Sequence, residues 1–209
     1  MRIAVYSDIS CPWCYIASRA LRCAIGAFEG ADDLELVARP YQIDGERPAE
    51  PTPMLEFLAA KYGHDRAMEM SREVTETGAR VGIEFDNASG FAVNTLQAHR
   101  MLYLVGGEYG WRTRLELEEQ LFAAWFTHGG NVADQEVLVG CAKWAGVPRD
   151  VAERFAGSDE GLMEVRALIA AARDEVRVVP TVVFGSRTTI ENAQHPQIYL
   201  DAMRSMAAV

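Results

Sequence analysis

Strand-like segments lie only at the two ends of this sequence, and that distribution limits the possible folds more than any other feature. Residues 2–7 and 33–41 are apolar-rich runs typical of strands, and residues 181–191 contain two more runs joined by a glycine–serine pair. Residues 51–175 show only helical periodicity. The simplest packing for this order is one sheet that both chain ends complete and a helical insertion interrupts.

A helix is expected between the first two strands. It carries an apolar stripe at helical spacing and ends near Gly30. The stripe consists of Ile16, Ala20, Cys23, Ala24 and Ala27. The chain therefore begins with the strand–helix–strand order of a parallel α/β unit.

Capping residues predict where the later helices begin and end. Asn94 is a candidate cap for a helix that ends at Gly106–Gly107, and a further helix is expected over residues 113–128. Asp134 is a candidate cap for the helix that follows, and Ser158 for a long helix before the last strands.

We expect three parts along the chain. Residues 1–48 form the first part of an α/β domain, and residues 49–157 form an all-helical insertion domain. Residues 158–209 supply a connecting helix and the second part of the α/β domain, including a hairpin and a last helix. The fold class is therefore α/β, with the order β-α-β … β-β-α.

The charge of the chain excludes some classes of partner. The formal net charge is −10 and the isoelectric point is near 4.9, which argues against nucleic acid and anionic membranes. The sequence has neither the apolar core of a signal peptide nor a run of about 18 apolar residues. We therefore expect a cytoplasmic protein, in which a close cysteine pair serves redox or metal chemistry more often than structure.

The segment CPWC places two cysteines directly after the first strand. Pro12 suits the first position of a helix, which makes Cys11 the N-cap and Cys14 the third helical residue. A sulfur at the N-cap can accept hydrogen bonds from free backbone N–H groups, and the helix dipole favours a negative charge there. The placement favours thiolate chemistry, with Cys11 as the nucleophile and Cys14 as the resolving thiol.

A structural zinc site is the alternative for this pair, but it needs four ligands. The other cysteines, Cys23 and Cys141, are single, and each falls on an apolar helical stripe, where we expect both to be buried. Redox chemistry is therefore favoured over metal binding, and no metal ligand is predicted.

Pro180 precedes the terminal hairpin and allows two interpretations. It is either an ordinary trans proline that opens a strand, or the second residue of a cis Val179–Pro180 bond that faces Cys11. The second arrangement would leave the backbone of Val179 free to pair with an extended substrate.

Several stretches together resemble a known family. CPWC at a helix start and VPT before the returning hairpin resemble the thioredoxin superfamily, and especially its DsbA branch. NTLQAHR, LFAAWFTHGGNVADQEVL and ENAQHP resemble the FrnE subgroup of DsbA-family proteins, over nearly the whole chain. The resemblance implies a thioredoxin fold with a helical insertion.

The resemblance also implies thiol–disulfide oxidoreductase or disulfide isomerase activity. Cys11 and Cys14 would be catalytic, and Pro180 would be the cis proline. The implied partner is a protein or small molecule that carries a thiol or disulfide, with no resident cofactor and with glutathione as an alternative redox partner. Because Trp13 stands where a histidine is common in the family, we expect a less extreme oxidant.

Substrate contacts are expected from six residues around the motif and the later stretches. They are Pro12, Trp13, Asn94, His99, Val179 and Thr181. Asp8 lies three residues before Cys11 and is interpreted as a solvated carboxylate at the end of a strand, with a role in proton relay as the alternative.

Two other functions fit the same architecture. It resembles the kappa-class glutathione transferases and 2-hydroxychromene-2-carboxylate isomerases, which use glutathione and typically have serine in place of the cysteine pair. A redox-sensing or chaperone-like binding module is the non-enzymatic alternative.

Overall fold

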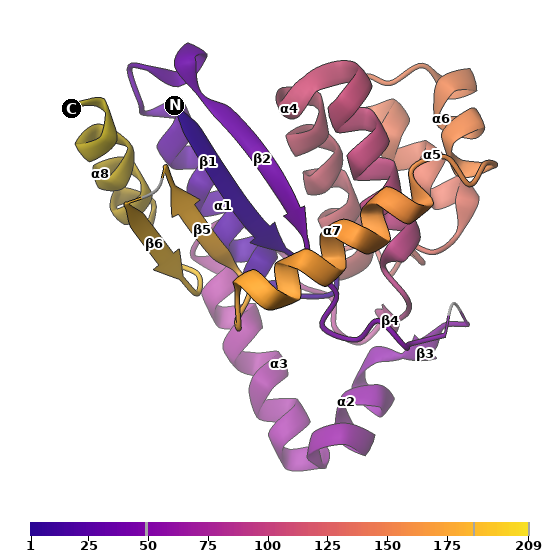
Figure 1. Cartoon of the computed structure of the whole chain (residues 1–209). Helices are drawn as coiled ribbons and strands as arrows, with labels where there is room; N and C mark the ends of the chain where they lie inside the picture. The colour runs from indigo at the N-terminus through magenta and orange to yellow at the C-terminus, as the bar shows by residue number, and fades with distance from the viewer. Residues whose placement is uncertain (49, 186, 209) are drawn as a thin grey trace.

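One four-stranded sheet is built from both ends of the chain, in the order β2-β1-β5-β6 (Figure 1). The computed structural model describes residues 1–48, 50–185 and 187–208. The strands are β1 (Arg2–Ser7), β2 (Glu35–Pro40), β5 (Thr181–Phe184) and β6 (Thr188–Glu191). β1 runs parallel to β2 and antiparallel to β5, which pairs with β6 as an antiparallel hairpin. The order expected for a thioredoxin fold is confirmed. Ser186 of the expected hairpin turn lies outside the described residues.

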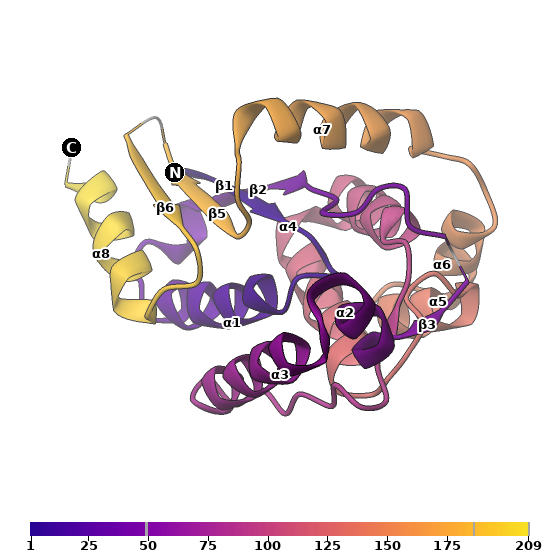
Figure 2. The same cartoon turned by 90° about the horizontal axis from the view of Figure 1, so that it is seen from below.

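Helices cover both faces of the sheet. Figure 2 shows α1 (Pro12–Gly26) and α8 (Pro196–Ala207) on one face and α7 (Leu162–Glu175) on the other. A short 3-10 helix, Ala31–Asp33, precedes β2. Ile3 and Phe184 of the sheet are fully buried in one core with apolar side chains of α1 and α8. Because both faces are covered, the central strands β1 and β5 carry mainly buried and half-buried residues, and only the edge strand β6 alternates between half-buried and exposed residues.

The middle of the chain is helical, as expected. It contains α2 (Met54–Tyr62), α3 (His64–Ala79), α4 (Leu96–Phe126), α5 (Gln135–Trp144) and α6 (Arg149–Ala156). Two short strands, β3 (Thr52–Pro53) and β4 (Phe91–Ala92), also pair within this region. The insertion is therefore helical with one small β-ribbon. Strands of two residues are too short to produce a periodic pattern, so the sequence did not predict this ribbon.

A second core joins α1 to the helical region. Tyr15 of α1 stacks on Phe122 of α4 with ring centroids 5.0 Å apart, and Phe85 meets Tyr15 edge-on at 5.9 Å. Trp125 and Leu121 of α4 are also buried in this core. Offset and edge-on aromatic pairs stabilise a contact beyond the effect of the apolar area that they bury. These pairs therefore hold the helical region against the start of α1.

Several helix ends differ from the expectation. The helix after residue 94 does not stop at Gly106–Gly107 but continues to Gly110, whose φ of 82° and ψ of 172° break α4. The N-cap of α7 is Gly161 and not Ser158, because the chain enters the helix through a left-handed conformation at Gly161, with φ 74° and ψ 0°. Asp134 caps α5 as expected, since its side chain accepts hydrogen bonds from two backbone N–H groups.

Among the described helices, none is both long enough and apolar enough to cross a membrane.

Candidate functional site

The first turn of α1 presents the CPWC motif. Cys11 is the N-cap with φ −99° and ψ 111°, and Pro12 occupies the first helical turn, as expected. The Cys14 N–H donates to the Cys11 carbonyl at 3.0 Å. The expected hydrogen bonds from backbone N–H groups to the Cys11 sulfur are not formed. The Cys11 thiol instead faces the carbonyl oxygen of Val179, with 3.9 Å between sulfur and oxygen.

The segment before β5 lies beside the motif. The expected cis Val179–Pro180 bond is confirmed. Thr181 is buried, and its hydroxyl donates to the Val178 carbonyl at 2.7 Å, which closes a tight turn at the start of the strand. Cys11 and Val179, which are 168 positions apart in the sequence, thus come into contact in the fold.

The two thiols of the motif are both buried and free. The exposed fraction is 5% for Cys11 and 2% for Cys14. Burial, together with the hydrogen bond and charge of the neighbouring Cys11 sulfur, holds the pKa of Cys14 well above its usual value. Cys14 therefore stays a neutral thiol at neutral pH, as suits a thiol that reacts second.

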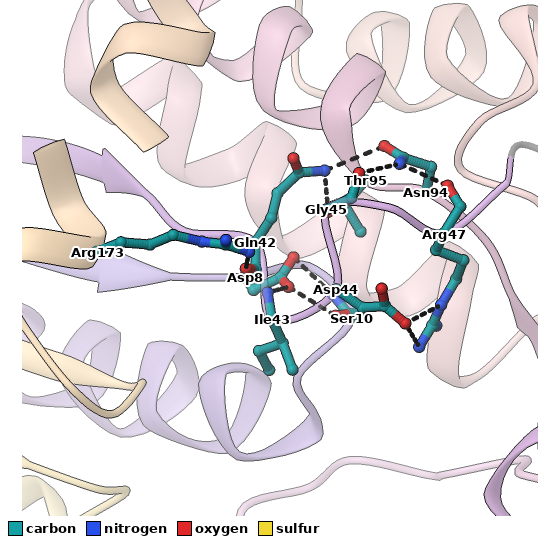
Figure 3. A network of polar contacts seen from close by, with 10 residues as sticks. All are labelled: Asp8, Ser10, Gln42, Ile43, Asp44, Gly45, Arg47, Asn94, Thr95 and Arg173. Atoms are coloured by element: carbon teal, nitrogen blue, oxygen red, sulfur yellow. Dashed lines mark hydrogen bonds and ion pairs between the residues drawn. The ribbon is translucent and has the colours of Figure 1, made fainter. Parts of the chain in front are cut away.

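Asp8 holds the loop that leads into the motif (Figure 3). Its carboxylate accepts hydrogen bonds from the Ser10 hydroxyl at 2.7 Å and from the Ile43 N–H at 2.8 Å. It also lies 3.2 Å from the His99 Nε2 atom, while its carbonyl accepts from the Cys11 N–H at 3.0 Å. Asp8 is 1% exposed, so the interpretation as a solvated carboxylate is wrong. The loop after β2 and helix α4 enclose the Asp8 side chain through Ile43 and His99. Residues near Asp8 in the sequence cannot reveal these contacts.

Asn94 holds the loop after β2. Its side-chain amide donates to the Arg47 carbonyl at 2.7 Å, and its oxygen accepts from Gln42 at 3.0 Å (Figure 3). On the other side of the loop, Arg173 of α7 donates to the Gln42 carbonyl at 2.7 Å. Neither Asn94 nor His99 lines the cavity beside Cys11 described below, and both support the loops around it.

A cavity of about 290 Å³ opens beside the motif. Ser10, Cys11, Pro12 and Trp13 form one wall of it. Side chains of α2 and α3 form the opposite wall, including Phe57, Leu58, Lys61, Arg66 and Met70. We call this space the α2–α3 cavity. Two of the expected substrate contacts, Pro12 and Trp13, therefore line a cavity that also contains Cys11.

The α2–α3 wall was not anticipated from the sequence. A helical stripe such as Leu55, Leu58 and Tyr62 is typical of a core-facing helix, yet no residue of α2 is buried. No local sequence pattern distinguishes a helix that lines a cavity from one that faces the core, so the sequence held no signal for this wall.

The two other cysteines differ from one another. Cys141 is buried as expected, and burial raises its pKa to about 11. Cys23 is exposed, so the expected burial is wrong. It lies at the edge of the α1 stripe, between the buried Leu21 and Ala24. Among the described residues, no group of three or more His, Cys, Asp or Glu side chains is placed to hold a metal ion.

The whole architecture matches a known family. The family model described as DSBA-like thioredoxin domain matches residues 2–204. The chain belongs to this family. No curated protein sequence matches it significantly.

Several solved structures have the same fold as this DsbA-like chain. A probable DsbA oxidoreductase from Streptomyces coelicolor is 26% identical, with a TM-score of 0.87, over 100% of this chain and 90% of that one. The 2-hydroxychromene-2-carboxylate isomerase is 15% identical, with a TM-score of 0.68, over 99% of this chain and 96% of that one. The cytosolic disulfide reductase DsbM from Pseudomonas aeruginosa is 15% identical, with a TM-score of 0.66, over 100% and 99%. At these last two identities the likeness concerns the fold alone.

Proposed function

We propose that this chain is a thiol–disulfide oxidoreductase that exchanges disulfides with a thiol- or disulfide-containing substrate through Cys11 and Cys14. The observation that carries the proposal is the asymmetry of the pair. Cys11 caps α1 and lines the α2–α3 cavity, whereas Cys14 does not line this cavity and has a raised pKa. A nucleophile that lines a cavity, next to a protonated partner thiol, is an arrangement suited to exchange through a mixed disulfide.

The exchange proceeds in two steps. In the reducing direction, the Cys11 thiolate attacks one sulfur of a substrate disulfide, which breaks that bond and releases the other sulfur as a thiolate. Cys14 then attacks the Cys11 sulfur and closes the protein disulfide, while the substrate leaves as a second thiol. The released thiolates take up the protons that the cysteines lose, and two electrons pass to the substrate. Oxidation of a substrate follows the same steps in reverse.

The residues around the pair have separate roles in this proposal. The Val179 carbonyl, which faces the Cys11 sulfur, offers an acceptor for the backbone N–H of an extended substrate, and Pro180 and Thr181 hold it there. Pro12 and Trp13 contact substrate inside the cavity. Asn94 and His99 act at a distance, through the loop and the Asp8 side chain.

A trapping experiment tests the proposal. Pre-reduced wild-type protein and the variants Cys11→Ser, Cys14→Ser and Cys23→Ser are mixed with a disulfide-bonded peptide, and adducts are mapped by mass spectrometry. We expect turnover by wild type and Cys23→Ser, none by Cys11→Ser, and a peptide adduct on Cys11 in Cys14→Ser. Cys23→Ser is the matched control, since its thiol is exposed and lies away from the pair.

The same experiment separates the alternatives. Full activity in Cys14→Ser, with tight glutathione binding, would contradict the dithiol mechanism and favour a glutathione-dependent isomerase or transferase. Absence of any adduct on Cys11, with aggregation of unfolded proteins suppressed equally by Cys11→Ser, would favour a binding module. The proposal also includes isomerase activity, membership of the FrnE subgroup and the domain division at residues 49 and 158, with glutathione as an alternative redox partner. Ala49 itself lies outside the described residues.

A further inference from the structure

Helix α2 has an apolar side that the protein itself does not cover. Met54, Phe57 and Leu58 are only half-buried, and all three line the α2–α3 cavity. No residue of α2 is fully buried, although the helix is rich in apolar side chains. An apolar face left open beside a reactive sulfur is suited to the carbon skeleton of a ligand.

The charged side chains that line this cavity are mainly basic, whereas the protein as a whole is acidic. Arg47, Lys61 and Arg66 line it, with Glu73 as the acidic side chain among the lining residues. The two arginines are engaged, since Arg47 pairs with Asp44 at 3.2 Å and Arg66 pairs with Glu69 at 2.6 Å.

Lys61 differs from the two arginines that line the cavity. In the part of the chain that the structure describes, its ammonium group forms no ion pair. Its Nζ atom lies 5.8 Å from the centroid of the Phe57 ring and 5.4 Å from that of Tyr62. An ammonium group held against aromatic rings, without a carboxylate, is available to an anionic ligand.

We infer that the α2–α3 cavity selects small disulfides whose apolar body ends in a carboxylate. The sulfur meets Cys11, the carbon skeleton lies along Met54, Phe57 and Leu58, and the carboxylate pairs with Lys61. This inference rests on the proposed function, which it narrows to one class of substrate.

The reaction with such a disulfide is the same thiol–disulfide exchange as in the proposed function, and its bond changes can be stated for this substrate. The Cys11 thiolate attacks one sulfur of R–S–S–R, where R carries the carboxylate, and one R–SH leaves after taking up a proton. Cys14 then displaces the second R–SH and closes the Cys11–Cys14 disulfide. The two cysteine thiols are the reductant, so a single turnover of pre-reduced protein needs no other electron donor.

The overall charge of the chain makes the expected preference informative. A net charge of −10 attracts cationic disulfides and repels acidic ones, so long-range electrostatics alone predicts the reverse order. A preference for the acid therefore requires a local site.

The test compares three disulfides that differ only in the end group. Pre-reduced protein is mixed with the symmetrical disulfides of mercaptohexanoic acid, mercaptohexanol and aminohexanethiol, and closure of the cysteine pair is followed by rapid alkylation and mass. We expect the acid to react about threefold to tenfold faster than the alcohol, as one partly screened ion pair allows, and the amine to react slowest. Raising the ionic strength should reduce this preference.

Matched variants assign the preference to one side chain. In Lys61→Met the acid-to-alcohol ratio should fall towards one, whereas Lys143→Met, which changes an exposed lysine on α5, should keep the wild-type ratio. Lys61 is exposed, so its replacement should leave the fold intact.

Three results would overturn the inference while the oxidoreductase proposal stands. They are equal rates for the three disulfides, an acid preference that Lys61→Met retains, and a disulfide peptide without acidic residues that reacts faster than the acid. Failure of every disulfide to close the cysteine pair would instead contradict the proposed function itself.

Discussion

Cys11 and Cys14 lie within one helical turn, yet their surroundings give them different chemistry. Both belong to the core that contains Tyr15, but Cys11 also lines the α2–α3 cavity and faces a carbonyl oxygen, whereas Cys14 does not line that cavity. Burial and the adjacent sulfur disfavour the charged form of Cys14. In the proposed exchange, this difference makes Cys14 the thiol that reacts second, because a thiol reacts as a nucleophile only in its thiolate form.

The raised pKa of Cys14 predicts slow alkylation in the folded, reduced protein. At about pH 8, Cys14 should react with iodoacetamide at least about tenfold more slowly than the exposed Cys23, because little of it is thiolate. Cys141, with a pKa of about 11, should be similarly slow. Time-resolved peptide mass spectrometry measures the rates, and denatured protein provides the control in which all four thiols react alike. Equal rates for Cys14 and Cys23 in the folded protein would contradict this account.

At the scale of elements, the site depends on contacts between segments that are distant in the sequence. Asp8 follows β1, Ile43 follows β2, and His99 lies in the first turns of α4. The carboxylate of Asp8 bonds to both of the others, so one buried side chain ties the sheet to the helical region just below the motif. A buried carboxylate is stable only with such partners.

This connection predicts a dependence of stability on acid. Burial raises the pKa of Asp8, but hydrogen bonds from His99, Ile43 and Ser10 and the charge of His99 outweigh it and lower the pKa overall. An unfolded aspartate titrates near about pH 4. The stabilisation from a lowered pKa is therefore present above that pH and is lost as pH falls through the folded-state value.

Asp8→Asn should accordingly flatten the acid limb of the stability profile. The free energy of unfolding, measured by urea titration between about pH 3 and 7, should fall less steeply below pH 4 in Asp8→Asn than in the wild type. Asp32→Asn is the control, because Asp32 is fully exposed and its ion pair with Arg112 is screened by solvent, so the slope should stay nearly unchanged. Parallel slopes for wild type and Asp8→Asn would show that the Asp8 carboxylate does not stabilise the fold.

At the scale of the whole molecule, the sequence revealed the order of elements better than their meeting points. Strands at both ends, the N-cap position of Cys11 and the Asp134 cap all depend on residues close in sequence, and periodicity and capping describe them well. The break of α4 at Gly110 was missed because nearby Gly106 and Gly107 are helical, and glycine alone does not say which position bends.

The cavity could not be predicted in the same way. Lys61 and Phe57 line the same cavity as Cys11 because α2 and α3 lie beside α1, as Figure 2 shows, and no local pattern encodes that placement. Burial of Asp8 has the same origin, since its partners come from residues 43 and 99. The cavity and the burial of Asp8 both depend on tertiary contacts between distant segments, and for this reason sequence patterns did not predict them.

The most direct test of the central claim is the reduction potential of the Cys11–Cys14 pair. The protein is equilibrated in glutathione buffers of graded composition, and alkylated thiols are counted by mass. We predict a reversible two-electron transition between about −120 and −270 mV, the span of known dithiol exchangers, with Cys23 and Cys141 remaining reduced. If Cys11 and Cys14 never form a reversible disulfide, or stay masked until a chelator removes a metal, the pair is not a redox centre and the account is wrong.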